Sequence, residues 1–483
     1  MMVSTCRTKR NGTGGHDHVV NGAANGQATG KRLNRETFRT SRLLDFCSQK
    51  ELVAQTGHAV NDWPLVVLKE LLDNDIDACE DAEVSPTVKV AVDSSGITVS
   101  DSGPGIPAET VEGILDFSIR VSSREAYVSP TRGAQGNALK TIVAMPFVLD
   151  GNEGRMEIAA CGVRHDITIR VDRIRQKPVI DHQAKEDRLV KNGTSLRLYW
   201  PDSASSLLEN SRQRFLQIAE DFTILNPHLT LSLDWFGERT EHKATVKNWK
   251  KWLPSWPTSA HWYTAEHFKR LVSACIAADA DRGQDRTVRE LVRQFDGLTG
   301  TAKQKAVLEA TGLSRLNLSA LCDGNALDSE KTCKLLAAMR DQTKAVKPAA
   351  LGIIGKEHLA ARFEALGAVM DTFKYKKATG VTDDIPWIVE TAFAWNPKGN
   401  KKRLITGVNW SPGINNPFRK LGQYGESLDS ILEQQRAGGD EPILLALHLA
   451  CPRVEYTDRG KSAVVIGGTT EEESEAYEHK PCK

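Results

Sequence analysis

The sequence has no long hydrophobic run, no paired cysteines and almost no net charge, and each absence excludes a class of protein. No apolar run approaches the roughly 18 residues that a membrane span needs, so we expect no membrane association. The nine cysteines are scattered without a Cys-x-x-Cys pair, which excludes a disulfide scaffold and a zinc ribbon and favours a reducing, cytoplasmic environment. Because 63 lysines and arginines face 62 aspartates and glutamates, any nucleic-acid contact must come from a local patch.

What is present fits a globular protein of about three domains, with 483 residues, 40% of them hydrophobic and 26% charged. The N-terminal stretch is polar, rich in Gly and Asn, and lacks the apolar core of a signal peptide. We expect a disordered tail at 1–35, an α+β domain at 36–236, a tryptophan-rich linker at 237–264, a helical domain at 265–346, an α/β domain at 347–470 and an acidic tail at 471–483.

The α+β domain begins with an amphipathic helix. In WPLVVLKELLDNDIDACEDA, Pro64 suits a first turn, and apolar residues recur at three- and four-residue steps. The segment TVKVAVDSSGITVSDSG alternates as two strands around an Asp-Ser-Ser-Gly turn, and RMEIAACGVRHDITIRV and GTSLRLYW have the pattern of further strands. These elements predict helices on one face of a mainly antiparallel sheet.

The rest of the chain has three parts. The linker carries four tryptophans between residues 249 and 262, among prolines and lysines. We expect it to pack against a domain, with a nucleic-acid stacking surface as the alternative. Four helical stretches follow between residues 265 and 341, and from about residue 347 helices alternate with strands.

The first of three chemically informative motifs is Glu70-Leu-Leu-Asp-Asn74, inside the predicted helix. Glu70 and Asn74 project from the same side, one turn apart, and Asp77 shares their face. A carboxylate there can orient and deprotonate a water, and an amide oxygen can ligate Mg²⁺.

The second motif, Asp101-Ser-Gly103-Pro-Gly105, directly follows a predicted strand. A buried carboxylate can accept a hydrogen bond from an exocyclic amino group such as that of adenine, and the glycines let the backbone turn sharply against a ligand. The third motif is a glycine loop that runs into a helix and exposes N–H groups and the positive helix end to phosphates. It comprises Arg132, Gly133, Ala134, Gln135, Gly136, Asn137, Ala138, Leu139 and Lys140.

Each motif alone is weak evidence, but all three in this order resemble the Bergerat-fold (GHKL) ATPases. The resemblance is closest to the ATPase B subunit of topoisomerase VI, a type IIB DNA topoisomerase. ELLDNDIDACE stands where that family has an ELVDNSLDACE-like helix, and RGAQG at 132–136 matches its RGQQG-like loop. The GPGIP loop includes Ile106, and Gly193-Thr194 fits a fourth family element at the head of a strand.

The resemblance implies roles for these residues. Glu70 would be the general base for attack of water on the γ-phosphate of ATP, and Asn74 would hold Mg²⁺. Asp101 would read the adenine amino group with support from Thr194, and residues 117–131 would form a lid. The implied ATP-binding set is Asn74, Asp77, Asp101, Gly103, Gly105, Ile106, Gly133, Ala134, Gln135, Gly136, Asn137, Ala138, Leu139 and Thr194.

The family next has a helix-two-turn-helix insert and then a transducer domain, which fit the helical and α/β segments. ALHLACPRVEYTDRGKSAVV resembles the segment that ends at the family's switch lysine, and Lys461 falls at that position, where it would reach the γ-phosphate. The resemblance implies a homodimer that closes on ATP binding as a clamp around DNA and works with a separate DNA-cleaving partner.

Three features depart from the family pattern. Asp75 stands where the family has a small residue; we favour a solvated side chain that points away, with altered metal affinity or slowed hydrolysis as the alternative. Asn137 replaces a typical glycine of the phosphate loop. Only 22 residues follow Lys461, with a Gly-Gly pair and an acidic run, so we do not expect the family's long docking helix for the cleaving partner.

Two other functions remain open. An ATP-regulated interaction or defence-system protein would have the same fold without topoisomerase activity. A sensor kinase would need a phosphoacceptor histidine. His58 lies only a dozen residues before Glu70 and without a dimerisation hairpin, so we expect His58 to cap or pack.

Overall fold

The computed structural model describes residues 46–115, 126–133, 138–172, 174, 177–187, 192–324, 326–399, 401–419, 426–457 and 463–465. The expected tails at 1–35 and 471–483 lie outside this part, as do most of the expected lid, residues 134–137 of the glycine loop, and Lys461. Among the described helices, none is long and apolar enough to cross a membrane.

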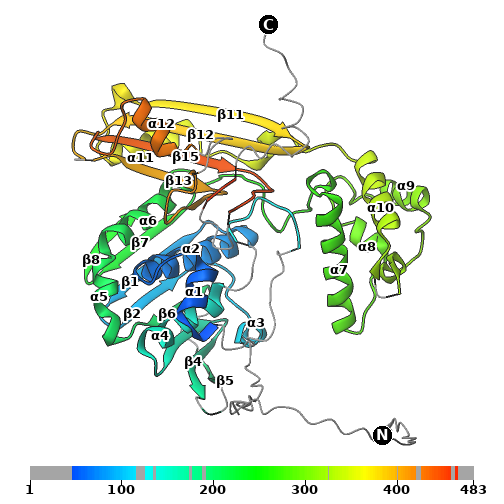
Figure 1. Ribbon diagram of the computed structural model, residues 1–483, viewed down its shortest axis with the longest axis horizontal. Coiled ribbons are helices and arrows are strands. Elements are labelled where there is room, and N and C mark those ends of the chain that lie inside the picture. The colour runs from blue at the N-terminus through cyan, green and yellow to red at the C-terminus, as the bar shows by residue number, and fades with distance from the viewer. Residues whose placement is uncertain are drawn as a thin grey trace, which may run out of the picture. The chain divides into compact units, whose positions relative to one another are not determined.

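An eight-stranded sheet underlies the first half of the chain, in the order β5-β4-β3-β6-β2-β1-β7-β8 (Figure 1). Every neighbouring pair is antiparallel except β1 and β7, which confirms the predicted mainly antiparallel sheet. The last strand extends beyond residue 236. The strands are β1 (Thr87–Asp93), β2 (Gly96–Ser100), β3 (Gly154–Ala160), β4 (Val163–Asp172), β5 (Lys177–Glu186), β6 (Thr194–Tyr199), β7 (Thr230–Trp235) and β8 (Glu238–His242).

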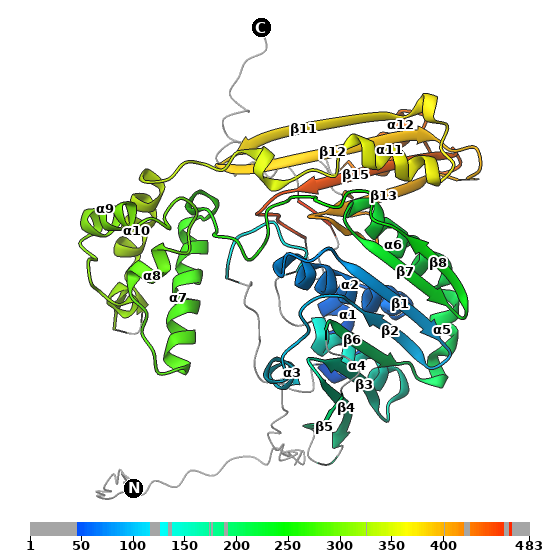
Figure 2. The ribbon, with the colours of Figure 1, turned by 180° about the vertical axis from the view of Figure 1, so that it is seen from behind.

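Helices cover one face of this sheet, and Figure 2 shows the sheet from the other side. In β1 every second residue is buried, as expected of a strand with one face against a core. The apolar residues that recur at three- and four-residue steps along the first long helix are each at most 1% exposed. They are Leu65, Leu68, Leu72, Ile76 and Cys79. The helices are α1 (Gln49–Thr56), α2 (Trp63–Asp81), α3 (Ala108–Leu115), α4 (Ala138–Asp150), α5 (Ser205–Asn210) and α6 (Arg212–Leu225).

The helical stretch folds as predicted into α7 (Ala265–Asp281), α8 (Val288–Val292), α9 (Thr301–Thr311) and α10 (Ser329–Asp341). Local sequence fixes their starts. Thr264 and Asp328 cap α7 and α10 with their side chains, and Thr287 and Glu290 form a capping box on α8. A short hairpin, β9 (Cys322–Asp323) and β10 (Ala326–Leu327), was not predicted.

A five-stranded sheet follows, in the order β11-β12-β15-β13-β14, and it is antiparallel except between β13 and β15. The edge strand β11 escaped prediction because most of its residues are polar and exposed. The elements are α11 (Lys356–Ala365), β11 (Lys374–Thr382), β12 (Ile385–Trp395), β13 (Arg403–Val408), β14 (Ser411–Pro412), α12 (Leu428–Gln434) and β15 (Ile443–Ala450).

The tryptophan-rich segment packs against the rest of the molecule, as expected. Trp252 and Trp262 are buried with their rings 4.9 Å apart, and the Trp249 ring lies edge-on to Trp410 at 5.7 Å. Trp256 is 44% exposed, yet its ring contacts Trp252 at 5.8 Å. The packing interpretation is therefore confirmed for this segment.

Candidate functional site

Helix α2 carries two oxygen-bearing side chains, Glu70 and Asn74, that have no partner among the described residues. Glu70 is partly exposed and Asn74 is exposed, and neither forms a hydrogen bond or ion pair with the described residues. Carboxylate and amide oxygens suit Mg²⁺, which keeps several non-protein ligands. Within the described ranges no group of three or more His, Cys, Asp and Glu side chains could hold a metal.

Asp101 is held in a fixed orientation where β2 ends beside the start of β6. Its Oδ1 accepts the Gly103 N–H at 2.5 Å, and its Oδ2 accepts the Thr194 N–H at 3.0 Å. Burial raises the pKa of Asp101, and the hydrogen bonds from Gly103 and Thr194 oppose that rise. Together these contacts orient a carboxyl group that retains lone pairs for a ligand.

Glycine is required at two positions where the turn after Asp101 packs against the segment that leads into β6. Gly193 has φ +76°, and a Cβ there would lie 2.0 Å from the Asp101 carbonyl oxygen. Gly105 has φ +86°, and a Cβ there would lie 2.8 Å from Cys161 Sγ. The predicted motif glycines therefore serve backbone geometry. Ile106 follows and packs on the core beneath the turn.

The described part of the glycine loop ends at Gly133, where the Thr131 hydroxyl donates to the Gly133 carbonyl at 2.7 Å. Helix α4 begins at Ala138, followed by Leu139, so the N-terminus of α4 follows the loop as predicted. The loop residues between them and the candidate switch lysine lie outside the described residues. These residues are Ala134, Gln135, Gly136, Asn137 and Lys461.

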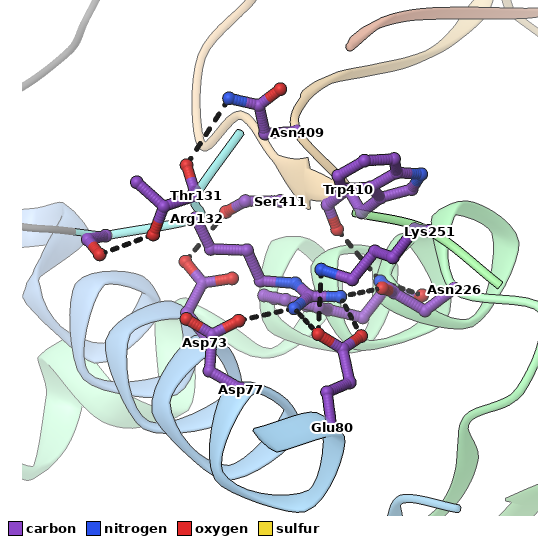
Figure 3. A network of polar contacts seen from close by, with 12 residues as sticks. Asp73, Asp77, Glu80, Thr131, Arg132, Asn226, Lys251, Asn409, Trp410 and Ser411 are labelled. Carbon is purple, nitrogen blue, oxygen red and sulfur yellow. Dashed lines mark hydrogen bonds and ion pairs between the residues drawn. The ribbon is translucent and has the colours of Figure 1, made fainter. Parts of the chain in front are cut away.

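Arg132 is buried at the base of this loop and joins it to α2 (Figure 3). One guanidinium nitrogen lies 2.5 Å from Asp77 Oδ1 and 2.7 Å from Glu80 Oε2. The other donates to Glu80 Oε1 at 2.8 Å and to Asn226 Oδ1 at 2.5 Å. Asp77, which the sequence places among the ATP-binding residues, is thus engaged with Arg132.

Lys251 of the tryptophan-rich segment completes this buried cluster. Its Nζ lies 2.7 Å from Glu80 and 4.5 Å from the centre of the Trp410 ring. Burial opposes ionisation of Glu80, but Arg132 and Lys251 hold its pKa well below the usual range. Two cations therefore balance the two carboxylates of Asp77 and Glu80, which makes their burial tolerable.

The turn between β13 and β14 brings the C-terminal sheet onto the same region. Asn409 and Trp410 adopt left-handed φ values of +49° and +65°. The Trp410 carbonyl accepts from Asn226 Nδ2 at 2.8 Å, and Asn409 Nδ2 donates to the Thr131 carbonyl at 3.4 Å. This turn thus contacts both the cluster and the segment just before the glycine loop.

A second link joins this turn to α2 through Asp73. The Ser411 hydroxyl and Lys69 Nζ each donate to Asp73 Oδ2 at 2.7 Å. Sequence reasoning missed Asp73, Lys251, Asn409 and Ser411 as site neighbours. Charged residues three or four apart on a helix normally indicate a face exposed to solvent. Whether such a face is instead buried depends on a partner from a distant segment, which the local sequence does not reveal.

The expectation that the Asp75 side chain is solvated is wrong for its Oδ2, although the residue as a whole is partly exposed. Its Oδ2 is fully buried and has no hydrogen-bond partner among the described residues. Burial raises the pKa of Asp75 well above its usual range, and the nearby Asp101 carboxyl adds to the effect. The pattern misled because Asp75 directly follows the exposed Asn74, while the next turn of α2 packs against the Asp101 turn.

His58 packs, as expected. It is 9% exposed, and its Nδ1 lies 3.5 Å from the Asn415 side-chain nitrogen.

Comparison with known proteins places these observations in context. No protein-family model matches the chain. It is similar to proteins named as the B subunit of type 2 DNA topoisomerase 6. The relative from Archaeoglobus fulgidus is 22% identical over 428 residues, which cover 83% of this chain and 66% of that protein. The relative from Methanococcoides burtonii is 26% identical and covers 83% of this chain and 64% of that protein. The relative from Metallosphaera sedula is 23% identical and covers 82% of this chain and 74% of that protein.

These similarities confirm the resemblance inferred from the motifs, and the chain spans just under two thirds of the length of the first relatives. Among solved structures, the ATPase region of Saccharomyces cerevisiae topoisomerase II is 11% identical over 83% of this chain and 77% of that one, with a TM-score of 0.36. The ATPase and transducer domains of Balamuthia mandrillaris topoisomerase II are 12% identical, over 83% of this chain and 76% of that chain, with a TM-score of 0.34. Structural similarity at this level supports no conclusion on its own.

Proposed function

Because the chain is a relative of the B subunits of type 2 DNA topoisomerase 6, we propose that it is a Mg²⁺-dependent GHKL ATPase that closes as an ATP-gated homodimeric clamp on DNA. In this proposal it alters DNA topology together with a separate cleaving partner. The observation that carries the proposal is the Asp101 carboxyl, which two backbone amides hold in place. Glu70 and Asn74 of α2, which form no hydrogen bond or ion pair with the described residues, support it.

The chemistry follows from the positions of these side chains. Asp101 accepts a hydrogen bond from the exocyclic amino group of adenine, and Thr194 holds Asp101 in place. Glu70 orients the attacking water and takes its proton, and Asn74 would hold Mg²⁺. The ion, when bound, neutralises charge on the phosphates. The protein thus contributes positioning and electrostatic stabilisation.

The remaining phosphate contacts are assigned to the glycine loop and the N-terminus of α4, from Gly133 to Leu139, because helix N-termini favour anions. Lys461 is proposed to reach the γ-phosphate. Contacts of the β13–β14 turn with Thr131 and Asp73 support a coupling between nucleotide occupancy and the C-terminal sheet. The nucleotide domain would comprise 36–236, the helix-two-turn-helix-like insert 265–346 and the transducer 347–470.

Nucleotide-driven dimerisation tests this proposal. With Mg²⁺ and a non-hydrolysable ATP analogue, we expect wild type and Glu70→Gln to form dimers, because Glu70 acts on water and not on binding. Asp101→Asn should stay monomeric, since an amide presents a donor as well as an acceptor to the base. Size-exclusion chromatography with light scattering measures mass, and phosphate release measures hydrolysis, which Glu70→Gln should lower by about 10²-fold or more.

Glu83→Gln, an exposed charge change just beyond the end of α2, is the matched control and should behave as wild type. A wild-type chain that binds the analogue yet stays monomeric would contradict the clamp, and an ATP-regulated interaction protein would then be the better description.

A further inference from the structure

The outer face of the five-stranded sheet, opposite the buried side chains of Ile388 and Ala392, is apolar and partly exposed. Along β12 every second residue is buried, and the residues between them are partly exposed. The residues of this outer row are Trp387, Val389, Thr391, Phe393 and, with 38% exposure, Trp395. An antiparallel sheet with one face in water normally carries polar residues on that face. An apolar outer row therefore indicates that a further segment covers it.

Only part of this outer face has a cover among the described residues. Three leucines of β15 pack against a small cluster built from β13, α12 and nearby segments. The leucines are Leu445, Leu447 and Leu449, and the cluster comprises Val408, Phe418, Leu428 and Val464. The outer row of β12 does not belong to this cluster. The strip of the outer face along β12 and β11 therefore stays partly exposed.

The edge strand β11 adds positive charge beside this strip. It pairs with β12 on one side, and its other side has no strand partner among the described residues (Figure 1). Lys374 lies opposite Phe393 in the pairing with β12, and Lys376 follows two residues later on the same face. Both lysines are exposed, and neither forms an ion pair with a described residue. An unpaired edge can accept an extended segment, and lysines on it favour an acidic one.

The chain itself leads from this outer face into an acidic segment. Val464, almost the last described residue, is buried in the cluster on the outer face and donates its N–H to the Pro417 carbonyl at 2.8 Å. Residues 466–483 lie outside the described residues. Their acidic run at 471–475 contains Glu471, Glu472, Glu473 and Glu475.

The lysines of β11 lie within reach of this run. Val464 shares its cluster with Val408 of β13, which the strand pairings place in line with Ala378 of β11. From β13 to β11 is three strand spacings, about 14 Å, and Lys376 lies about 7 Å farther along β11. The combined distance is about 16 Å, whereas the seven residues at 465–471 span up to about 23 Å when extended.

We propose that the acidic run at 471–475 docks on the outer face beside β11, with its carboxylates on Lys374 and Lys376. Ile466 and Tyr477, on either side of the run, would then cover the apolar row of β12. This inference goes beyond the proposed function, because it involves neither the nucleotide nor a partner. A docked run would keep the two lysines from other polyanions and would thus act as an internal competitor for this surface.

Chemical cross-linking of the full chain tests the contact. A carbodiimide joins a carboxylate to an amine that touches it, and mass spectrometry identifies the joined peptides. The wild-type chain should give cross-links between residues 471–475 and Lys374 or Lys376. A mixture of chains with normal and heavy nitrogen separates cross-links within one chain from those between two. Cross-links found only between light and heavy chains would overturn the inference, because the occupant would be a second copy.

Neutralising the acidic run provides a second measurement. In Glu471→Gln with Glu473→Gln, acetylation of Lys374 and Lys376 should become about fivefold faster, the effect of losing two exposed ion pairs. High salt should speed acetylation of the wild-type lysines in the same way, since salt screens exposed charges. Equal acetylation rates in wild type and variant would overturn the inference.

Glu330→Gln with Glu364→Gln is the matched control. It removes two exposed acids, from α10 and α11, and should leave the acetylation of both β11 lysines unchanged. Thermal unfolding establishes that each variant is folded. Duplex DNA distinguishes a nucleic-acid site, because lysines that react fully in the free chain and are protected only by DNA would overturn the inference. Every measurement is made without nucleotide, so failure of the inference would leave the proposed function standing.

Discussion

At the scale of single residues, the orientation of the Asp101 carboxyl, the candidate base-binding group, depends on Gly193, the residue just before β6. Gly193 donates its N–H to the Gly103 carbonyl at 2.8 Å and passes directly over the Asp101 backbone. No side chain fits between them, because a Cβ would lie 2.0 Å from the Asp101 carbonyl oxygen. The orientation of Asp101 is thus set by backbone packing.

Gly193→Ala should therefore destabilise the protein and abolish nucleotide binding. Gly151→Ala is a matched control, because Gly151 has the same φ of +76° with nothing within 4 Å of its Cβ position. The left-handed backbone alone should cost Gly151→Ala roughly 1–2 kcal/mol. Gly193→Ala should cost about 1–3 kcal/mol more, from steric overlap. Denaturant unfolding measures both, and equal losses would show that the Gly193 contact is relieved elsewhere.

At the scale of elements, a buried carboxylate fastens α11 to the C-terminal sheet. Glu390 of β12 is 1% exposed and accepts the N–H groups of Ile354 and Gly355, just before α11, at 2.7 and 2.9 Å. Tyr375 of β11 donates its hydroxyl to the same carboxylate at 2.7 Å. One side chain therefore joins two strands and the start of a helix.

The stability that Glu390 contributes should depend on pH. Burial opposes its ionisation, but His448 and the two backbone amides outweigh burial and lower its pKa to about 2. Because the folded pKa is lowered, the contribution is full above the unfolded value of about 4.5 and is lost as pH falls toward 2. The difference in unfolding free energy between wild type and Glu390→Gln should shrink by about 3 kcal/mol across that window. A difference constant with pH would show that Glu390 is not ionised in the folded protein.

At the scale of the whole molecule, the Arg132 cluster joins segments from four parts of the chain. Arg132 precedes the glycine loop, Asp77 and Glu80 belong to α2, Asn226 follows α6, and Lys251 comes from the tryptophan-rich segment. Asn226 passes the connection on to Trp410 of the C-terminal sheet. Together with the contact of Asn409 with the Thr131 carbonyl, this cluster connects the segment just before the glycine loop to that sheet.

Arg132→Met should cost about 3–5 kcal/mol, because it removes the guanidinium that pairs with both buried carboxylates, Asp77 and Glu80. Arg170→Met is the control, since the Arg170–Asp181 pair is about half exposed on both sides and such pairs contribute about 1 kcal/mol or less. Chemical denaturation compares the two variants. Similar small losses in both would mean that water or rearrangement replaces the buried pairing.

The sequence pattern was sufficient to predict helices and strands where interactions between residues close in the chain decide the structure. The period of apolar residues predicted α2 and the strand pair β1–β2, and the Asp101 and glycine-loop motifs lie at element ends as expected. Pattern failed at β11, whose polar residues form a sheet edge, and at Asp75, whose neighbour Asn74 is exposed. In both cases a partner segment decided the outcome.

The sequence by itself determined the helices and strands of the candidate site and the placing of Glu70 and Asn74 one turn apart on α2, because periodicity, caps and turns act over a few residues. Only the tertiary structure decided which charges are buried and paired. Asp73 and Ser411 meet across 338 residues of chain, and Arg132 meets Asn226 across 94. The free energy of a charged side chain depends on its burial and its neighbours, and folding alone brings those neighbours together.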